Sequence, residues 1–174
     1  MNDKEKKIKS HLIYEGKILS LYVDDVVLPD GNLSQREIVR HHGGACVLAI
    51  INDKIIMEKQ FRYAYNDFVY ELPAGKVEKG EDPKATARRE LLEETGYEAE
   101  ELISLGEVYP SVGYTDEIIY LYIAKGLTKK ERHLDPNEYL DVIYVDKDEA
   151  LKMIKDGRIK DSKSQIAILK YFYL

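Results

Sequence analysis

The sequence predicts an α/β fold in which helices cover a mixed β-sheet. Short runs of apolar and β-branched residues, separated by turn residues, indicate strands, and three periodic segments with recognisable ends indicate helices. Strands interleaved with helices in one chain of 174 residues form a layered α/β domain. With 44% hydrophobic and 33% charged residues, the chain can bury a sizeable core, which excludes intrinsic disorder.

The N-terminal part is expected to form an antiparallel β hairpin. A strong turn signal, PDGN at residues 29–32, separates two extended runs at 17–28 and 33–42 that are rich in apolar residues. The basic KEKK segment at residues 4–7 reads as a solvated arm and not as a nucleic-acid contact. Two consecutive glycines mark a boundary, so we expect an N-terminal β segment over 1–42 and the main domain over 43–174.

Six further strands are expected in the main domain. They lie at residues 45–51, 54–61, 68–72, 102–109, 117–125 and 139–145. The first two are joined at Asn52-Asp53 and read as core strands because they are rich in apolar residues.

The first helix has interpretable chemistry at both ends. Asp82 serves as the N-cap, Pro83 takes the first helical position, and good helix formers continue through Glu94. Gly96, just past the end, favours a left-handed C-cap. Gly75 is expected to allow a tight turn before the helix in the same way.

Two later helices are interpreted as structural. The second is expected to run from Asp146 to the residue before Gly157, and Asp146 with Glu149 resembles a capping box. The third helix starts near Asp161. Its apolar face is expected to comprise Ile166, Leu169 and Tyr173.

Charge and composition exclude several classes of function. The chain has 26 Lys plus Arg against 32 Asp plus Glu, a formal net charge of −6, which argues against duplex DNA or an anionic membrane as its partner. No apolar run approaches the roughly 20 residues that cross a bilayer, and no secretory signal is recognisable, so a cytoplasmic location is expected. The single cysteine, Cys46, lies in an apolar run and reads as a small buried hydrophobic residue.

The most informative residues are three glutamates on one helix face. Glu90, Glu93 and Glu94 are spaced i, i+3 and i+4, so their carboxylates lie within about 100° of arc. Like charges at this spacing destabilise a helix by about 0.2–0.5 kcal/mol per pair, and the helix dipole disfavours anions near its C-terminus. A hard cation such as Mg²⁺ would justify the arrangement, and a solvated acidic face is the alternative.

The residues around these glutamates favour the metal. Residues 75–97, GKVEKGEDPKATARRELLEETGY, resemble the signature box of the Nudix hydrolases, which cleave nucleoside diphosphates linked to another moiety. Tyr97 departs from the aliphatic residue that is usual at the last place, which is a packing position. The resemblance implies a Nudix-type α/β/α sandwich with a mixed sheet, preceded by the N-terminal antiparallel hairpin.

By this resemblance, residues in and before the helix bind metal. Glu90 and Glu94 would be ligands, Glu93 a ligand or an orienting group, and the Ala74 carbonyl a further ligand. Arg89 would hold the carboxylates in place. The implied cofactor is Mg²⁺, with Mn²⁺ as an alternative.

The rest of the chain resembles the ADP-ribose pyrophosphatase branch of that family. The supporting segments are LYVDDVVLPDGNLSQREIVRHHG, KQFRY, YPSVGYTDE and DPNEYLDVIYV. In that branch the N-terminal strands exchange with a partner subunit and the dimer builds the substrate site, so a homodimer is expected. The alternative is that the first 42 residues pack on their own chain.

The branch also implies substrate contacts. Arg62 would contact the diphosphate, because a guanidinium donates paired hydrogen bonds. Arg36 and Glu37 match a strand pair near the adenosine moiety, and strand alternation places them on opposite faces, so at most one faces the site. Ser111 and Glu117 would lie near the terminal ribose.

Three further assignments rest on the resemblance alone. Glu138 matches a glutamate that relatives use, on a mobile loop, as catalytic base or water-orienting group. Glu81 would buttress the loop before the helix. Some relatives stack adenine on an aromatic residue near the position of Ile18, and here Tyr22 or an arginine plane would substitute.

The expected reaction is metal-dependent hydrolysis of ADP-ribose to AMP and ribose 5-phosphate. Water would attack the adenosyl phosphorus. The expected partner is a small-molecule nucleotide, and neither nucleic acid nor a membrane is expected to bind. Three alternatives stay open: hydrolysis of another nucleotide sugar or dinucleotide, hydrolysis of a damaged triphosphate, and a non-catalytic Nudix module that senses a nucleotide.

Overall fold

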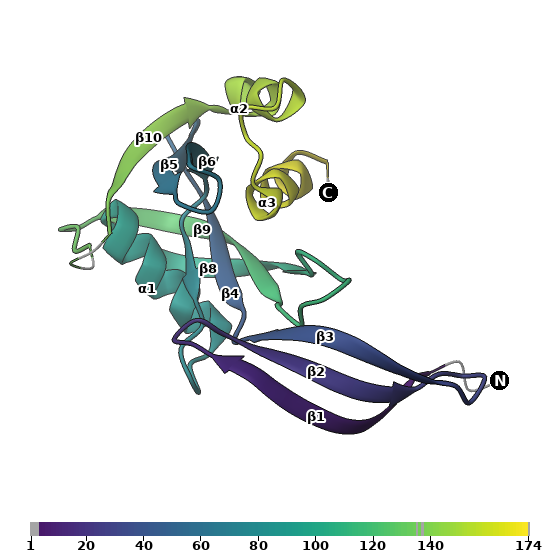
Figure 1. Cartoon of the computed structure of the whole chain (residues 1–174). Helices are drawn as coiled ribbons and strands as arrows, with labels where there is room; N and C mark the ends of the chain where they lie inside the picture. Colours follow the sequence, from purple (N-terminus) through teal and green to yellow (C-terminus); the bar gives the residue numbers. More distant parts are fainter. Residues whose placement is uncertain (1–3, 135, 137, 174) are drawn as a thin grey trace. The chain divides into compact units, whose positions relative to one another are not determined.

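The computed structural model describes residues 4–134, 136 and 138–173. Two residues of the DPNEYLDVIYV segment, Asp135 and Asn137, lie outside the described residues. The chain folds into two compact units, each with its own β-sheet (Figure 1). Within the described ranges, no helix is long and apolar enough to cross a membrane.

One unit contains the chain up to Gly43 together with Tyr109–Ile118, and the remaining described residues form the other unit. The second segment of the first unit pairs with the strand that ends near residue 41. The backbone N–H of Val39 donates to the Tyr114 carbonyl at 2.7 Å, and the N–H of Asp116 donates to the Val39 carbonyl at 3.2 Å. The boundary expected at residue 42 does not anticipate this grouping, because the grouping arises from backbone pairing between segments that are distant in the sequence.

The N-terminal unit is a three-stranded antiparallel sheet in the order β1-β2-β3. Strands β2 (Leu19–Val27) and β3 (Leu33–His41) form the hairpin expected from the turn signal between them. Strand β1 (Lys6–Glu15) was not among the individual strands expected, and its first two residues belong to the KEKK segment that read as a solvated arm. Nine of the ten residues of β1 are exposed, so Lys6 and Lys7 are solvated as expected, but they belong to a strand that pairs with β2 and not to a free arm.

The second unit contains a mixed sheet in the order β10-β5-β4-β9-β8, with β6 added to β5 and β7 added to β4. Only the pairing of β4 with β9 is parallel. The six expected strands are present, and the three-residue strand β7 was not anticipated. The strands are β4 (Gly44–Ile51), β5 (Lys54–Arg62), β6 (Asp67–Glu71), β7 (Ala74–Lys76), β8 (Tyr97–Val108), β9 (Ile119–Lys129) and β10 (Leu140–Asp146).

Helices cover both faces of this sheet (Figure 1). The helices are α1 (Pro83–Thr95), α2 (Lys147–Lys155) and α3 (Ser162–Tyr173). On one face, Leu91 of α1 packs in a cluster with Val47. On the other face, Ile168 of α3 packs in a cluster with Leu48. The expected α/β/α sandwich with a mixed sheet is therefore confirmed.

Two details of the predicted helices were wrong. Asp146 precedes α2, but its side chain makes no capping hydrogen bond, so there is no capping box. On α3, Tyr173 is 72% exposed, whereas Ser164, Ala167 and Ile168 are fully buried. The side of α3 that is buried is set by its contact with the sheet, which short-range periodicity does not specify.

Candidate active site

Helix α1 has firmly fixed ends, and these ends position the side chains that it carries. The Asp82 carboxylate accepts hydrogen bonds from the backbone N–H groups of Lys84 at 2.9 Å and Ala85 at 3.3 Å. At the other end Gly96 adopts φ 68°, as the sequence predicted, and its N–H donates to a carbonyl in the last turn. Capping by a side chain at the start and a left-handed glycine at the end satisfies backbone groups that a helix leaves unpaired.

Three glutamates of α1 lie on its inward-facing side. Glu94 is 3% exposed, Glu90 is 9% exposed and Glu93 is partly buried. Arg89 Nη1 donates to Glu90 Oε1 at 2.7 Å and to Glu93 Oε2 at 3.0 Å. The backbone N–H of Ala74 donates to Glu94 Oε2 at 2.9 Å. The structure therefore brings together the four residues expected to bind metal and Arg89, which was expected to hold their carboxylates in place.

Glu81 links the loop before α1 to the helix. It receives two hydrogen bonds from Arg89, from Nε at 3.1 Å and from Nη2 at 3.2 Å. It also accepts the backbone N–H of Glu78 at 3.1 Å. The bond to the Arg89 guanidinium lowers the pKa of Glu81 to about 2, so this carboxylate stays ionised as a partner of Arg89.

Gly75 is required by a close approach and not by a turn. A β-carbon added at Gly75 would stand 1.9 Å from Glu90 Oε1, and the φ of Gly75 is not positive. The expectation that Gly75 serves a tight turn was therefore wrong. Its role is to leave room for the Glu90 carboxyl group against strand β7.

A further glutamate, Glu58 of β5, lies in the same place and was missed by the sequence analysis. It is 3% exposed, and its Oε1 atom has no hydrogen-bond partner within the described residues. Burial raises the pKa of Glu58 to about 8, while a hydrogen bond with Glu94 acts in the opposite direction. The available signal was a charged residue inside a strand expected to belong to the core.

The buried carboxyl groups raise one another's pKa values. The pKa of Glu90 is raised to about 7, chiefly by burial and also by the nearby charges of Glu93 and Glu138, against the effect of Arg89. Burial also raises the pKa of Glu94 far above its ordinary value, and the charges of Glu58, Glu90 and Glu138 add to this. The single guanidinium of Arg89 does not compensate this much negative charge.

The carboxylate oxygens of these glutamates suit a hard divalent cation as ligands. The orphaned Glu58 oxygen shows that the buried polar groups are not satisfied by the protein alone. Among the described residues, no group of three or more His, Cys, Asp or Glu side chains would hold a metal ion as it stands. The carboxylates are instead turned toward Arg89 and the backbone of β7.

Glu138, from the loop between β9 and β10, also belongs to this cluster. It is partly buried, and its charge contributes to the raised pKa values of Glu58, Glu90 and Glu94. The sequence singled out this residue by resemblance alone, and the structure places it close enough to act on the helix carboxylates.

Arg62, at the end of β5, lies close enough to Glu94 for the charge of that carboxylate to act on it. Its Nε donates to Glu71 Oε1 at 2.5 Å and its Nη2 donates to Glu71 Oε2 at 2.9 Å. The Arg62 side chain is 42% exposed and lines a cavity of about 850 Å³. The guanidinium is thus held by one edge and open along the rest of its surface.

The other expected substrate contacts lie in the N-terminal unit. Arg36 Nε donates to Glu5 Oε2 at 3.0 Å, and Glu37 is exposed on the opposite face of β3. Ser111 and Glu117 belong to the segment that pairs with β3. The structure therefore places these four residues in the same unit.

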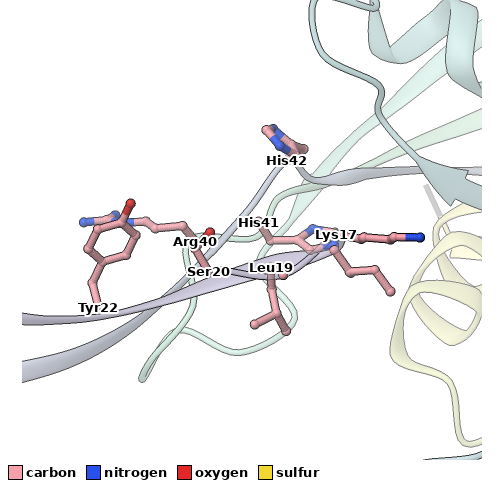
Figure 2. A pocket seen from close by; sticks show the side chains of 9 residues that line it. Lys17, Leu19, Ser20, Tyr22, Arg40, His41 and His42 are labelled. Carbon is pink, nitrogen blue, oxygen red and sulfur yellow. The ribbon is translucent and has the colours of Figure 1, made fainter. Parts of the chain in front are cut away.

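A small cavity of about 160 Å³ in the same unit contains the expected stacking candidates. Tyr22 and Arg40 line it and project to the same side of β2 and β3 (Figure 2). Arg40 is anchored by hydrogen bonds to Asp116 at 3.0 Å and Asp24 at 3.4 Å. Ile18 also lines this cavity.

The α/β/α sandwich, with buried helix carboxylates packed against strand β7, is the arrangement expected of a Nudix-type hydrolase domain. The family model of the NUDIX domain matches residues 40–165, and the nucleoside diphosphate sugar hydrolase N-terminal domain matches residues 5–39. The chain belongs to the Nudix hydrolase family, whose members generally need a divalent metal ion. The assignment based on residues 75–97 is confirmed.

Named relatives refine the comparison. The methanol dehydrogenase activator of Bacillus methanolicus is 53% identical over 94% of this chain and 90% of its own length. The ADP-ribose pyrophosphatase of Bacillus subtilis is 45% identical over the same shares of both chains, which confirms the resemblance to that branch. A crystal structure of an ADP compounds hydrolase has a TM-score of 0.86 over 97% of this chain and 92% of that chain. At 16% identity, this match supports the fold alone.

Proposed function

We propose that the protein hydrolyses the diphosphate of ADP-ribose to AMP and ribose 5-phosphate with Mg²⁺ as cofactor. The observation that carries this proposal is the convergence of Glu90, Glu94 and Glu138 beside an open arginine, Arg62. The 45% identity to an ADP-ribose pyrophosphatase supports the choice of substrate.

Separate residues of the chain would bind the metal ion and orient its ligands. Glu90, Glu94 and the Ala74 carbonyl would hold Mg²⁺, and Glu93 would serve as a ligand or orienting group. A bound divalent metal neutralises phosphate oxygens and lowers the pKa of water. Arg89 keeps the carboxylates in place through its hydrogen bonds to Glu90 and Glu93.

Other residues would act on the substrate and on water. Arg62 donates hydrogen bonds to the diphosphate, and Glu138 accepts a proton from the water that attacks the adenosyl phosphorus. In the N-terminal unit, Arg36 or Glu37 would contact the adenosine moiety. Ser111 and Glu117 of the same unit would contact the terminal ribose.

Hydrolysis in ¹⁸O-labelled water tests the direction of attack. We expect the label in AMP, and label in ribose 5-phosphate would contradict attack at the adenosyl phosphorus. A parallel panel of ADP-ribose, nucleotide sugars, dinucleotides and oxidised nucleoside triphosphates identifies the substrate class. Tight binding of ADP-ribose with no turnover would instead indicate a nucleotide sensor.

We also propose a homodimer in which the N-terminal strands contact a second subunit. Strand β1 exposes apolar side chains that a monomer would leave in water: Ile8, Leu12, Ile13 and Tyr14 are each about half exposed or more. Light scattering during size-exclusion chromatography should give twice the mass of the 20.1 kDa chain. A monomer at micromolar concentration would favour packing of residues 1–42 on their own chain.

A second candidate function is the activation of a dehydrogenase. The 53% identity to a methanol dehydrogenase activator, over nearly all of both chains, favours it. The test adds the purified protein to a methanol dehydrogenase and measures alcohol oxidation. An unchanged rate would exclude this candidate while leaving ADP-ribose hydrolysis intact.

A further inference from the structure

The first turn of α3 contacts the segment that leads into the metal site. Lys163 Nζ lies 2.5 Å from Glu71 Oε2 and 3.0 Å from Asp161 Oδ1. The Lys163 side chain is only 12% exposed, and that of Glu71 is 6% exposed. These charges are therefore largely removed from water. A hydrogen-bonded charge pair in the protein interior interacts more strongly than one at the surface.

A second bond from the same turn reaches the next residue of that segment. The backbone N–H of Leu72 donates to Ser164 Oγ at 2.7 Å, and Ser164 Oγ donates to Asp161 Oδ2 at 2.5 Å. Ser164 is fully buried. The start of α3 thus fixes two consecutive residues, Glu71 and Leu72, just before β7.

Glu71 connects this turn to Arg62. Both Glu71 oxygens accept hydrogen bonds from Arg62, and Oε2 also accepts a hydrogen bond from Lys163 Nζ. Within the described chain, the Arg62 Nη1 group has no hydrogen-bond partner, although the side chain lines the cavity of about 850 Å³. One edge of the guanidinium is held and the other remains available to an anion.

We propose that Lys163 is a positioning residue for substrate binding, which acts through Glu71 to hold Arg62 toward the cavity. This inference rests on the proposed function, because it takes Arg62 to contact the diphosphate. Lys163 stays charged in this role: burial alone would lower the pKa of Lys163, but Asp161 and Glu71 raise it above its ordinary value.

A double-mutant cycle tests the proposal. Arg62→Met and Lys163→Met should each raise the KM for ADP-ribose roughly tenfold while kcat changes less than about threefold. The double variant should be no worse than the weaker-binding single variant, because both changes remove one interaction. Lys155→Met, an exposed lysine on α2, is the matched control and should leave both constants unchanged.

The cycle distinguishes the inference from a purely structural role. The inference would be overturned if the increase in KM of the double variant equalled the product of the two single increases. A normal KM in folded Lys163→Met would also overturn it. If Lys163→Met does not fold, Glu71→Gln replaces it in the cycle with Arg62→Met, with the same expected and contrary results. Wild-type protein that does not hydrolyse ADP-ribose would refute the proposed function and this inference together. An active wild type with a normal KM in Arg62→Met would refute this inference and the contact of Arg62 with the diphosphate, while leaving ADP-ribose hydrolysis established.

Discussion

At the scale of single residues, the site contains side chains whose chemistry opposes stability. Glu94 is almost completely buried beside Glu58 and Glu90, so its ionisation is unfavourable in the metal-free protein. The same burial favours capture of a divalent cation, which replaces the missing positive charge. Such a residue is expected to serve function at the expense of stability.

Replacing Glu94 by Gln should therefore separate the two properties. We expect ADP-ribose hydrolysis to fall by at least about a hundredfold, because a neutral amide is a poor ligand for Mg²⁺. The metal-free variant should melt at a higher temperature than wild type at pH 8, because the amide avoids the cost of keeping a buried carboxyl protonated at a pH where it ionises in the unfolded chain. Calorimetric melting with a chelator, together with the Mg²⁺-dependent rate, checks both. Near-normal turnover would contradict the role of Glu94 as a ligand.

Gly75 tests the close packing of β7 against Glu90. Gly75→Ala places a methyl group where the Glu90 carboxyl lies, so Glu90 must move, and overpacking should destabilise the fold by about 1–3 kcal/mol. The free energy of unfolding in urea and the affinity for Mn²⁺ should both fall. Gly113→Ala is the stability control, since a β-carbon there meets nothing within 4 Å and its φ is not positive. Equal stability of the two variants would contradict this explanation.

At the scale of elements, α1 is a helix whose position depends on its caps. Its first turn is fixed by Asp82, while Asp146 stands before α2 without a capping hydrogen bond. The two aspartates thus occupy equivalent places with different contacts, and they provide a matched comparison of what a cap contributes.

Asp82→Ala should lower the free energy of unfolding by about 1 kcal/mol, because two backbone N–H groups lose their acceptor. Asp146→Ala should change it by only a few tenths of a kcal/mol, because its ion pair with Lys54 at 3.9 Å is exposed. Chemical denaturation of both variants measures the difference. Equal losses in the two variants would show that the cap at Asp82 contributes nothing special.

At the scale of the whole molecule, stability should depend on pH through the buried acids. Glu90 has a pKa raised to about 7, and the pKa values of Glu58 and Glu94 are also well above the ordinary value near 4.5. A carboxyl whose pKa is raised in the folded state stabilises the fold below its unfolded pKa. That contribution is lost as the pH rises through the folded pKa. The pKa of Glu81 is lowered to about 2, so this carboxylate stabilises the fold at neutral pH, and its contribution is lost only as the pH falls below 4.5.

The metal-free protein should accordingly become less stable between pH 5 and pH 9. Mg²⁺ should oppose this loss increasingly at high pH, because it binds the ionised carboxylates. Thermal melts across this range, with a chelator and with excess Mg²⁺, test the prediction, and Glu94→Gln should flatten the metal-free curve. A chelated protein whose melting temperature rises from pH 5 to pH 9 would contradict it.

The sequence by itself determined what depends on neighbouring residues. The ends of α1 follow from Asp82, Pro83 and Gly96, and the spacing of Glu90 and Glu94 on one helical turn indicates a metal site. The family and the α/β/α class follow from these local patterns together with the alternation of strands and helices.

Only the tertiary structure decided what depends on contacts between distant segments. Strand β1 exists through pairing with β2, Glu58 joins the site because packing brings it close to Glu94, and Lys163 reaches Glu71 across 92 positions of sequence. Gly75 is explained only by the Glu90 carboxyl beside it. The physical reason is that caps and helical spacing act over a few residues, whereas burial, charge coupling and strand pairing are properties of the packed chain.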